Sequence, residues 1–313
     1  MKFITHQDIV DLNIAPNQWY DWAEYVLQHK YEFVMPSKIS LHFNDSSYYN
    51  TLPSIIPGAD AMGTKMVNRY MGRTPSLESH LLLYRYSDGE FLSLMDANMI
   101  TAMRTGASAV HAMQTFANPD FHEVGMMGFG NIGISVLEVF CDHFKDKDLK
   151  VKLLRYKDHA EKMVQRFGHY DNIDFQIVDT YEEIIRDSDV VVSSITFTDQ
   201  LLGQDEWFKP GVLVLPVHLR GFQNCDLFFD KVYGDHEGQV SGFKYFDKFK
   251  SFAEVSEVLN GTKPGRESAD ERIIVYNVGM SIHDVYAARQ IYDLSEGKGL
   301  ELPQIGPSDR YWL

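Results

Sequence analysis

The segment EVGMMGFGNIGISVLEVF, residues 123–140, carries the strongest structural signal in this chain. A short apolar run ends at Gly128, and apolar residues at helical spacing follow Asn131. Gly128, Gly130 and Gly133 fit the pattern G-x-G-x-x-G, whose glycines allow a tight turn, an approach of the backbone to a diphosphate, and close helix–strand packing. The segment therefore predicts a turn that binds a dinucleotide, and a tight turn without a ligand is the alternative.

The chain after this turn alternates between strand-like and helix-like runs. KVKLLRY at 150–156, DVVVSSIT at 189–196 and GVLVLPV at 211–217 are short and apolar, as buried parallel strands are. Runs with helical spacing, such as DHAEKMVQRFGHY at 158–170, separate them. This alternation predicts a parallel sheet with helices on both faces, which is a Rossmann-type domain.

The chain before the turn has a different pattern. Residues 31–43 and 80–95 are strand-like, with alternating apolar and polar side chains and a turn at 87–89. This pattern is typical of an antiparallel sheet. Residues 7–30 and 98–117 have helical spacing. The first part of the chain therefore predicts an α+β arrangement.

The two patterns together predict two domains in one α/β protein. The change occurs near residue 118, and we expect the long helix-like run close to the C-terminus to return to the first domain. The expected α+β domain is formed by residues 1–117 with 285–313, and the expected dinucleotide-binding Rossmann domain by residues 118–284. A length of 313 residues agrees with two domains.

The composition favours a globular protein that handles small molecules. Lys and Arg total 29 against 44 Asp and Glu, and the net charge of −15 disfavours nucleic acid or an anionic membrane as a partner. Cys141 and Cys225 cannot form a disulfide framework, and no Cys/His cluster predicts a metal site. The N-terminus lacks the apolar stretch of a signal peptide, and no apolar run is long enough to span a membrane, so we expect a cytoplasmic protein.

The end of the second strand after the glycine turn bears on the choice of cofactor. An acidic residue there would bind the ribose hydroxyls of NAD(H), whereas an arginine would accommodate the 2′-phosphate of NADP(H). Arg155 lies 22 residues after Gly133, and no acid stands between the end of the strand and Asp158. We therefore expect NADP(H) to be favoured over NAD(H), the alternative being that Arg155 and Lys157 are ordinary solvated charges.

Two motifs of the first domain, GTKMVN at 63–68 and DANMITAMRTGA at 96–107, are specific in their order and spacing. MPSK at 35–38 and VYNVGMSIHD at 275–284 accompany them. Together with the glycine turn, these motifs resemble the ornithine cyclodeaminase/mu-crystallin family over nearly the whole chain. The resemblance implies a first domain that holds the substrate and forms a homodimer through its sheet, in addition to the Rossmann domain.

The resemblance also implies roles for single residues. Arg104 matches the family arginine that holds the substrate α-carboxylate, for which a planar guanidinium is suited; an ion pair on a helix surface is the alternative. Lys65 matches the family lysine near the carboxylate and the reacting carbon, where it would polarise an imine or transfer a proton. The expected cofactor contacts are Thr105, Gly128, Gly130, Asn131, Ile132, Gly133, Arg155, Thr196 and Gly279.

Three departures from the family pattern bear on the substrate. Lys38 stands where many members have arginine, which keeps a substrate-binding cation but loses the fork geometry. Ornithine cyclodeaminases bind the distal amine with a glutamate shortly before the Gly-x-Lys motif, and this chain has no glutamate there. Arg220 stands near the position of the cyclodeaminase aspartate, and Asp226 lies too far along the chain to replace it.

His218 and Arg220 follow a predicted strand, at the edge of the sheet where ligands bind in open α/β folds. His218 would exchange protons near neutral pH as a catalytic residue. Arg220 would bind a second carboxylate of the substrate. A structural histidine and an ordinary ion pair are the alternatives for these two residues.

Three functions remain open from the sequence. The first is an NAD(P)-dependent oxidoreductase that moves hydride at the Cα–N bond of an amino acid or imine. The second is an ornithine or lysine cyclodeaminase that releases ammonia with catalytic NAD. The third is a binding protein without activity, as mu-crystallin illustrates. The missing glutamate and the displaced aspartate favour the first.

Overall fold

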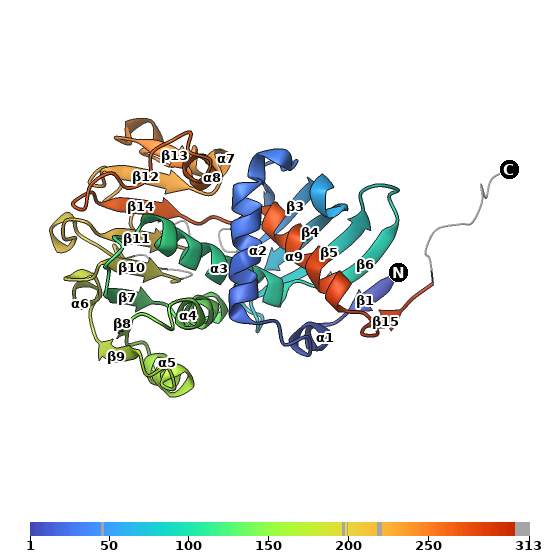
Figure 1. The fold of residues 1–313 in the computed structure, drawn as a ribbon, viewed down its shortest axis with the longest axis horizontal. Coiled ribbons are helices and arrows are strands. Elements are labelled where there is room, and N and C mark those ends of the chain that lie inside the picture. Colours follow the sequence, from blue (N-terminus) through green and yellow to red (C-terminus); the bar gives the residue numbers. More distant parts are fainter. Residues whose placement is uncertain (45–46, 196–197, 199, 218–220, 304–313) are drawn as a thin grey trace. The chain divides into compact units, whose positions relative to one another are not determined.

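The computed structural model describes residues 1–44, 47–195, 198, 200–217 and 221–303. Contacts divide the chain into two compact units, and Figure 1 labels their helices and strands. The first unit comprises Met1–Ile14, Tyr31–Thr101 and Ser281–Leu313. The second unit comprises Ala15–Lys30 and Ala102–Met280.

The first unit is built on a sheet in the order β15-β1-β6-β5-β4-β3-β2. The strands are β1 (Lys2–Ile4), β2 (Ile39–His42), β3 (Tyr48–Ile56), β4 (Ala61–Arg69), β5 (Leu77–Arg85), β6 (Phe91–Asp96) and β15 (Leu300–Glu301). β1 pairs with β6 in parallel, and the consecutive strands β2 to β6 pair antiparallel. Helix α9 (Ser281–Leu294) packs against β3, β4 and β5, and helix α1 (His6–Val10) follows β1.

Alternation along the central strands explains how α9 is seated. In β4, the side chains of Ala61, Lys65 and Val67 are buried, whereas those between them are partly exposed. Successive side chains of a strand point to opposite faces, so these residues share one face of the sheet. Lys65 stands out because a charged side chain occupies a position that the pattern reserves for apolar ones.

The second unit is built on a parallel sheet in the order β13-β12-β14-β11-β10-β7-β8-β9. The strands are β7 (Glu123–Met127), β8 (Leu149–Leu154), β9 (Ile173–Val178), β10 (Val190–Ser193), β11 (Leu213–Pro216), β12 (Lys231–Gly234), β13 (Phe252–Glu254) and β14 (Ile273–Tyr276). The chain runs from β7 outward through β8 and β9, and then returns to the other side of β7 at β10. Ligands of open α/β sheets bind at the carboxyl ends of the strands beside such a reversal.

The remaining α-helices belong wholly or mainly to the second unit. They are α2 (Pro16–Gln28), α3 (Asn98–Phe116), α4 (Asn131–His143), α5 (His159–Phe167), α6 (Tyr181–Ile185), α7 (Glu237–Val240) and α8 (Val255–Leu259). Short 3₁₀ turns lie at Lys30–Glu32, Pro57–Ala59, Asp205–Trp207 and Phe246–Lys248. α3 begins with four residues of the first unit and continues into the second.

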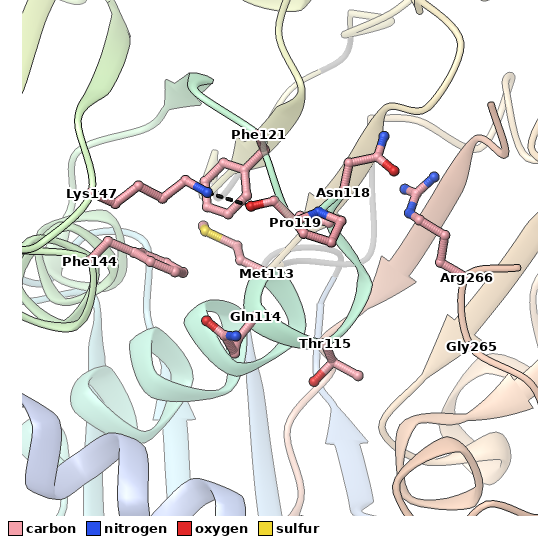
Figure 2. A pocket seen from close by; sticks show the side chains of 11 residues that line it. Met113, Gln114, Thr115, Asn118, Pro119, Phe121, Phe144, Lys147, Gly265 and Arg266 are labelled. Atoms are coloured by element: carbon pink, nitrogen blue, oxygen red, sulfur yellow. Dashed lines mark hydrogen bonds between the residues drawn. The ribbon is translucent and has the colours of Figure 1, made fainter. Parts of the chain in front are cut away.

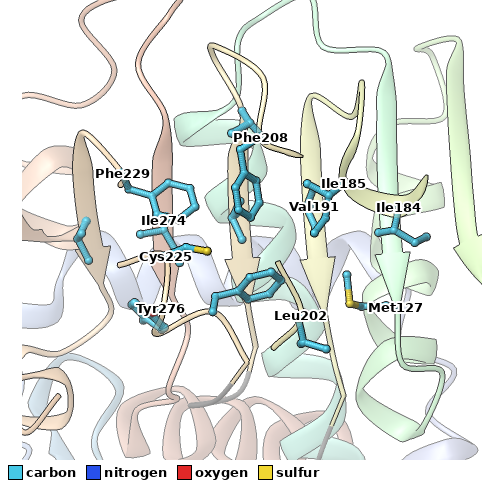
Figure 3. Packing of buried hydrophobic residues seen from close by; sticks show 14 of the residues in the cluster. Met127, Ile184, Ile185, Val191, Leu202, Phe208, Cys225, Phe229, Ile274 and Tyr276 are labelled. Atoms are coloured by element: carbon cyan, nitrogen blue, oxygen red, sulfur yellow. The ribbon is translucent and has the colours of Figure 1, made fainter. Parts of the chain in front are cut away.

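The hydrophobic core of the second unit packs against its parallel strands. Val191, Val214 and Ile274 come from three neighbouring strands, and each is fully buried. Phe208 and Phe229 pack edge to face in the same cluster, with ring centroids 5.3 Å apart (Figure 3). Burial of each large apolar side chain contributes about 1.5–3 kcal/mol to folding. Of these strands, β10 and β11 lie in the apolar runs that the sequence predicts as parallel strands.

The predicted fold class is confirmed, because one unit is built on a parallel Rossmann-type sheet and the other is an α+β unit. The contacts place residues 15–30 with the second unit, whereas the expected boundaries assign them to the first domain. The reason is tertiary: Asn17 N–H donates to Asp142 of α4 at 3.0 Å, and Lys30 donates to Glu254 at 2.6 Å. The division into domains that fold separately stays a prediction.

Both cysteines are buried, as the sequence predicts. Within the described ranges, no helix combines the length and the apolar character needed to cross a membrane. In the same part of the chain, no three His, Cys, Asp or Glu side chains are arranged to hold a metal ion.

Candidate active site

The glycine turn joins the end of β7 to α4, as predicted, and its glycines have different structural reasons. Gly128 has a φ of +87°, and a Cβ there would lie 2.6 Å from the carbonyl carbon of Ser194. A Cβ on Gly133 would lie 2.0 Å from the Gly128 oxygen. Gly130 instead faces open space, since a Cβ on it would meet nothing within 4 Å. Packing therefore requires Gly128 and Gly133, whereas Gly130 leaves room in front of the backbone.

A cavity of about 870 Å³ lies beside this turn, within the second unit. Its walls come from the ends of neighbouring strands and include Gly130, Leu154, Arg155, Asp179 and Ser194. Gly130 is the N-cap of α4, and no side chain caps the helix there. Amide groups at an uncapped helix start attract anions, so the space, the glycines and the helix end fit a dinucleotide.

Arg155 lines this cavity but is engaged by two acids. Its Nε lies 2.7 Å from Asp179 Oδ1, just after β9, and its guanidinium also pairs with Glu161 of α5. These side chains are largely exposed, and exposed ion pairs are weak because water screens them. Asp179 is not among the predicted site residues, although an acid directly after a strand of a parallel sheet is a signal in the sequence that could have indicated it.

Lys65 lies in the first unit, in the middle of β4 and on the face covered by α9. Its side chain is 2% exposed, and its Nζ lies 2.7 Å from Asp284 Oδ2 of α9, whose side chain is 0% exposed. Nζ also donates to Thr101 Oγ1 at 3.2 Å. In register with Lys65 stand Leu52 of β3 and Leu81 of β5, both buried. The ammonium thus lies between aliphatic side chains and contacts a carboxylate and a hydroxyl.

Arg104 lies on α3 in the second unit and is 8% exposed, which excludes the alternative of an ion pair on a solvated helix surface. The Nη edge of its guanidinium lies against Gly279. A Cβ on Gly279 would be 2.3 Å from Arg104 Nη1 and 3.0 Å from Cζ, and the φ of Gly279 is +94°. A side chain at residue 279 would therefore displace the guanidinium. Gly279, expected to contact the cofactor, is found against Arg104, and the cofactor contact stays a prediction.

A buried acid lies behind Gly279. Gly279 N–H donates to Asp235 Oδ2, at the end of β12, and Gln239 Nε2 donates to Gly279 O at 2.9 Å. Burial raises the pKa of the Asp235 carboxyl, and the Gly279 hydrogen bond and the charges of Lys30 and Arg104 oppose that rise. The carboxyl thus fixes the Gly279 turn and shares the electrostatic surroundings of Arg104.

Lys30 and Glu254 extend this polar cluster. Lys30 Nζ donates to Asp235 O at 2.7 Å and to Glu254 Oε2 at 2.6 Å. Burial would raise the pKa of Glu254, but hydrogen bonds from His236, Lys30 and the Glu237 amide hold it below its ordinary value. His236, at the N-cap of α7, lies 3.3 Å from Glu254. The cluster gives the loop after β12 an ionic core that the sequence did not reveal.

The other predicted site residues have varied surroundings. Thr105 is buried on α3, next to Arg104. Asn131 is exposed and Ile132 half-buried at the start of α4. Lys38 is half-buried and directly precedes β2, in the first unit. His218, Arg220 and Thr196 lie outside the described residues, and their roles stay predictions.

A second cavity, of about 510 Å³, lies at the C-terminal end of α3 and brings no predicted site residue together (Figure 2). Lys147 Nζ donates to Pro119 O at 2.6 Å, and Arg266 Nε donates to Phe116 O, the last residue of α3, at 2.8 Å. Arg266 also donates to Gly211 O at 3.0 Å. Cations at a helix C-terminus satisfy its carbonyls and oppose its dipole, so this arrangement caps α3.

Comparisons with known proteins agree with this geometry. The model of the ornithine cyclodeaminase/mu-crystallin family matches residues 3–299. Ketimine reductase mu-crystallin of Macropus fuliginosus is 28% identical, over 80% of this chain and 82% of its own.

Two solved structures share the fold. The Δ¹-pyrroline-2-carboxylate reductase of Thermococcus litoralis, in complex with NADH and L-proline, has a TM-score of 0.84 at 21% identity and covers 96% of this chain and 100% of its own. An archaeal alanine dehydrogenase dimer with bound NAD has a TM-score of 0.83 at 22% identity and covers 97% of this chain and 99% of its own.

Proposed function

Because this chain belongs to the ornithine cyclodeaminase/mu-crystallin family, we propose that it is a nicotinamide-dependent oxidoreductase acting at the Cα–N bond of an amino acid or imine. The observation that carries the proposal is Lys65, a buried ammonium fixed among aliphatic side chains in a chain that also has a complete dinucleotide turn. A relative is a ketimine reductase, and a structure of the same fold holds L-proline, the product of an imine reduction.

We assign the carboxylate of the substrate to Arg104 and Lys65. The Nη atoms of Arg104 pack against Gly279, and a planar guanidinium is suited to bind two carboxylate oxygens. The Lys65 ammonium adds a hydrogen-bond donor that cannot swing into solvent. The α-carbon of a substrate bound in this way would face the nicotinamide in a constant orientation. Such orientation is a large part of what a protein contributes to hydride transfer.

The cofactor would occupy the cavity beside the glycine turn. The amides at the start of α4 and the open face of Gly130 would hold its diphosphate. When bound, the nicotinamide would supply or accept the hydride. Ser194, in the cavity wall, packs against Gly128 and so keeps the turn in place.

Arg155 supports our proposal that NADP(H) is preferred over NAD(H). It is placed at the end of β8, in the wall of the cavity, where a 2′-phosphate would lie in a Rossmann domain. Its partners Asp179 and Glu161 are exposed, so a phosphate dianion would compete with them for the guanidinium. We propose that this exchange occurs when NADP(H) binds.

Reduction of an imine is favoured over cyclisation of a diamino acid. A distal ammonium needs a carboxylate, and the side chains in register with Lys65 are leucines. In the part of the chain that the structure describes, Asp284 contacts Lys65, and its carboxylate is already paired with that ammonium. The substrate side chain would therefore meet aliphatic groups at this position.

We propose that the protein is a homodimer formed through the first unit. All four residues of the edge strand β2 are exposed, and Ile39 and Leu41 are 55% and 59% exposed. An apolar groove of about 420 Å³ lies elsewhere on the first unit, with Val34, Ile55 and Met62 in its walls. An open strand edge and a contiguous apolar surface are typical of a covered interface, and a second copy is the occupant that the family resemblance implies.

The test is a panel of Δ¹-pyrroline-2-carboxylate, its six-membered homologue, keto acids with amines, and free amino acids, each with both cofactors. Nicotinamide absorbance and ammonia are recorded together. We expect imine-dependent oxidation of NADPH without release of ammonia. Ammonia from ornithine without net oxidation of cofactor would instead identify a cyclodeaminase. Binding of cofactor without turnover of any substrate would identify a binding protein.

A further inference from the structure

Lys65 and Asp284 form a buried ion pair inside the first unit. Their charged atoms are 2.7 Å apart, and their side chains are 2% and 0% exposed. Lys65 comes from the centre of β4, and Asp284 is the fourth residue of α9. The pair therefore joins the sheet to the helix that covers it.

Gly63 explains how the helix reaches the lysine. It precedes Lys65 by two residues and lies on the same face of β4. A Cβ on Gly63 would lie 2.5 Å from Leu82 O of β5 and 3.4 Å from Val285 Cγ2, the residue after Asp284. The glycine of the Gly-x-Lys motif thus leaves space for α9 on the sheet, which brings Asp284 to Lys65.

The surroundings make the carboxylate necessary to the ammonium. Leu52 and Leu81 flank Lys65 along the sheet, and neither can solvate a charge. A buried ion pair seldom stabilises a fold more than apolar side chains of the same size would, but a buried charge without its partner is strongly unfavourable. What the pair provides here is an ammonium that stays charged at a fixed place.

We propose that Asp284 is a positioning residue, which keeps Lys65 cationic and aims its ammonium at the substrate. The inference rests on the proposed function of Lys65. Thr101 supplies a second anchor at 3.2 Å, from α3 rather than from α9. Two anchors from different elements restrict a side chain that is otherwise flexible over four carbons, so the donor is oriented before the substrate arrives.

The experiment compares Asp284→Asn, Asp284→Glu and Asp293→Asn in the full chain. Asp293 is the matched control, because it lies on the same helix but is exposed and pairs with Arg289 at 2.9 Å. We expect Asp284→Asn to lower kcat/KM for the imine by about a hundredfold, and Asp284→Glu to recover about tenfold of that loss. Asp293→Asn should leave kcat/KM within about threefold of the unsubstituted protein.

A double substitution separates positioning from a general structural role. If Asp284 acts through Lys65, adding Asp284→Asn to a Lys65→Gln protein should change kcat/KM by less than about threefold. The inference is overturned if the two effects multiply, or if Asp284→Asn alone keeps full kcat/KM. If instead the unsubstituted protein reduces no imine, the proposed function fails, which is a different result.

Folding is checked by thermal unfolding and by binding of NADPH to each variant, because the glycine turn lies in the other unit. Should Asp284→Asn not fold, Thr101→Val removes the second anchor without leaving a buried charge. We expect this variant to lower kcat/KM by about tenfold, mainly through KM. An unchanged KM and kcat in Thr101→Val would then contradict the positioning of Lys65.

Discussion

The two cations that we assign to the substrate carboxylate are held in different ways. Lys65, in the first unit, contacts a carboxylate directly and is surrounded by leucines. Arg104, in the second unit, lies on the backbone of Gly279, and the acid Asp235 is reached through the Gly279 amide. A compact ammonium needs a counter-ion to stay charged when buried, whereas the Nη atoms of Arg104 are packed against a glycine that leaves room for them. The two cations are therefore held by different neighbours, Lys65 by a carboxylate and Arg104 by the backbone of a glycine.

Asp284 and Asp235 also differ in the cations with which they interact. Asp284 contacts Lys65 at 2.7 Å, so the charge of the lysine is largely compensated where it stands. The positive charges of both Lys30 and Arg104 act on the Asp235 carboxyl and oppose the rise of its pKa. Lys65 is therefore oriented by a direct ion pair, whereas Arg104 is positioned beside Gly279. Substitutions at the two places should have unequal effects.

The largest effect is expected for Arg104→Ala. Loss of the guanidinium removes a bidentate, charge-assisted contact, so kcat/KM should fall by about a hundredfold or more. Cofactor affinity, measured by fluorescence titration, should stay nearly unchanged. Arg166→Ala is the control, because Arg166 is exposed on α5 and pairs with Glu138 at 2.9 Å. Unaltered turnover in Arg104→Ala would refute the assigned role and remove the basis of the comparison.

The next prediction concerns the contact between Arg104 and Gly279. Gly279→Ala places a Cβ within 2.3 Å of Arg104 Nη1, so the guanidinium must move. We expect kcat/KM to fall by about tenfold to a hundredfold. Gly261→Ala is a matched control, because Gly261 also has a positive φ, +71°, but a Cβ there meets nothing within 4 Å. Equal losses in both variants would mean that backbone strain, rather than the contact with Arg104, explains the result.

A third cation, Arg155, extends the comparison to the surface. Asp179→Asn removes one of its exposed partners, so the affinity for NADPH should increase by about threefold to tenfold relative to that for NADH. The ratio of dissociation constants is measured at low and at moderate salt, since salt weakens such pairs. Asp174→Asn, an exposed acid on β9, serves as control. A ratio that does not change would leave Arg155 without a part in cofactor choice.

The smallest effect concerns the acid behind Gly279. Burial raises the pKa of Asp235, so the folded protein binds its proton more tightly than the unfolded chain does. Its contribution to stability is present below the ordinary pKa of an aspartate and is lost as the pH rises through the raised value. Asp235→Asn keeps an oxygen for the Gly279 amide but cannot ionise.

Urea denaturation at a series of pH values checks this expectation. The free energy of unfolding of Asp235→Asn should fall less than that of the unsubstituted protein as the pH rises from acid to neutral. Asp293→Asn, on the surface, should follow the unsubstituted protein. Identical pH dependence in all three proteins would contradict a raised pKa at Asp235.

The sequence predicts what depends on neighbouring residues. The glycine turn and the parallel strands follow from short-range patterns, because each strand and helix carries its own periodicity. Lys65 and Arg104 are found through local motifs. Their supports are not, because Asp284 and Asp235 are distant in the chain from the cations they serve, and only the folded topology brings them near. The sequence does not predict that residues 15–30 belong with the second unit, for the same reason. Their contacts depend on Asp142 and Glu254, which are distant in the chain.

The exposed strand β2 gives Lys38 a second possible use. An uncovered edge with aliphatic side chains invites a strand of any other molecule to add to it, which is how sheets begin to aggregate. Charged residues flanking such a strand act as gatekeepers, and Lys38 stands directly before Ile39. In dilute protein a partner that covers β2 would dissociate and leave the strand open. We therefore expect Lys38→Ala to aggregate faster, measured as a shorter time before turbidity develops. This effect does not depend on how the substitution changes turnover.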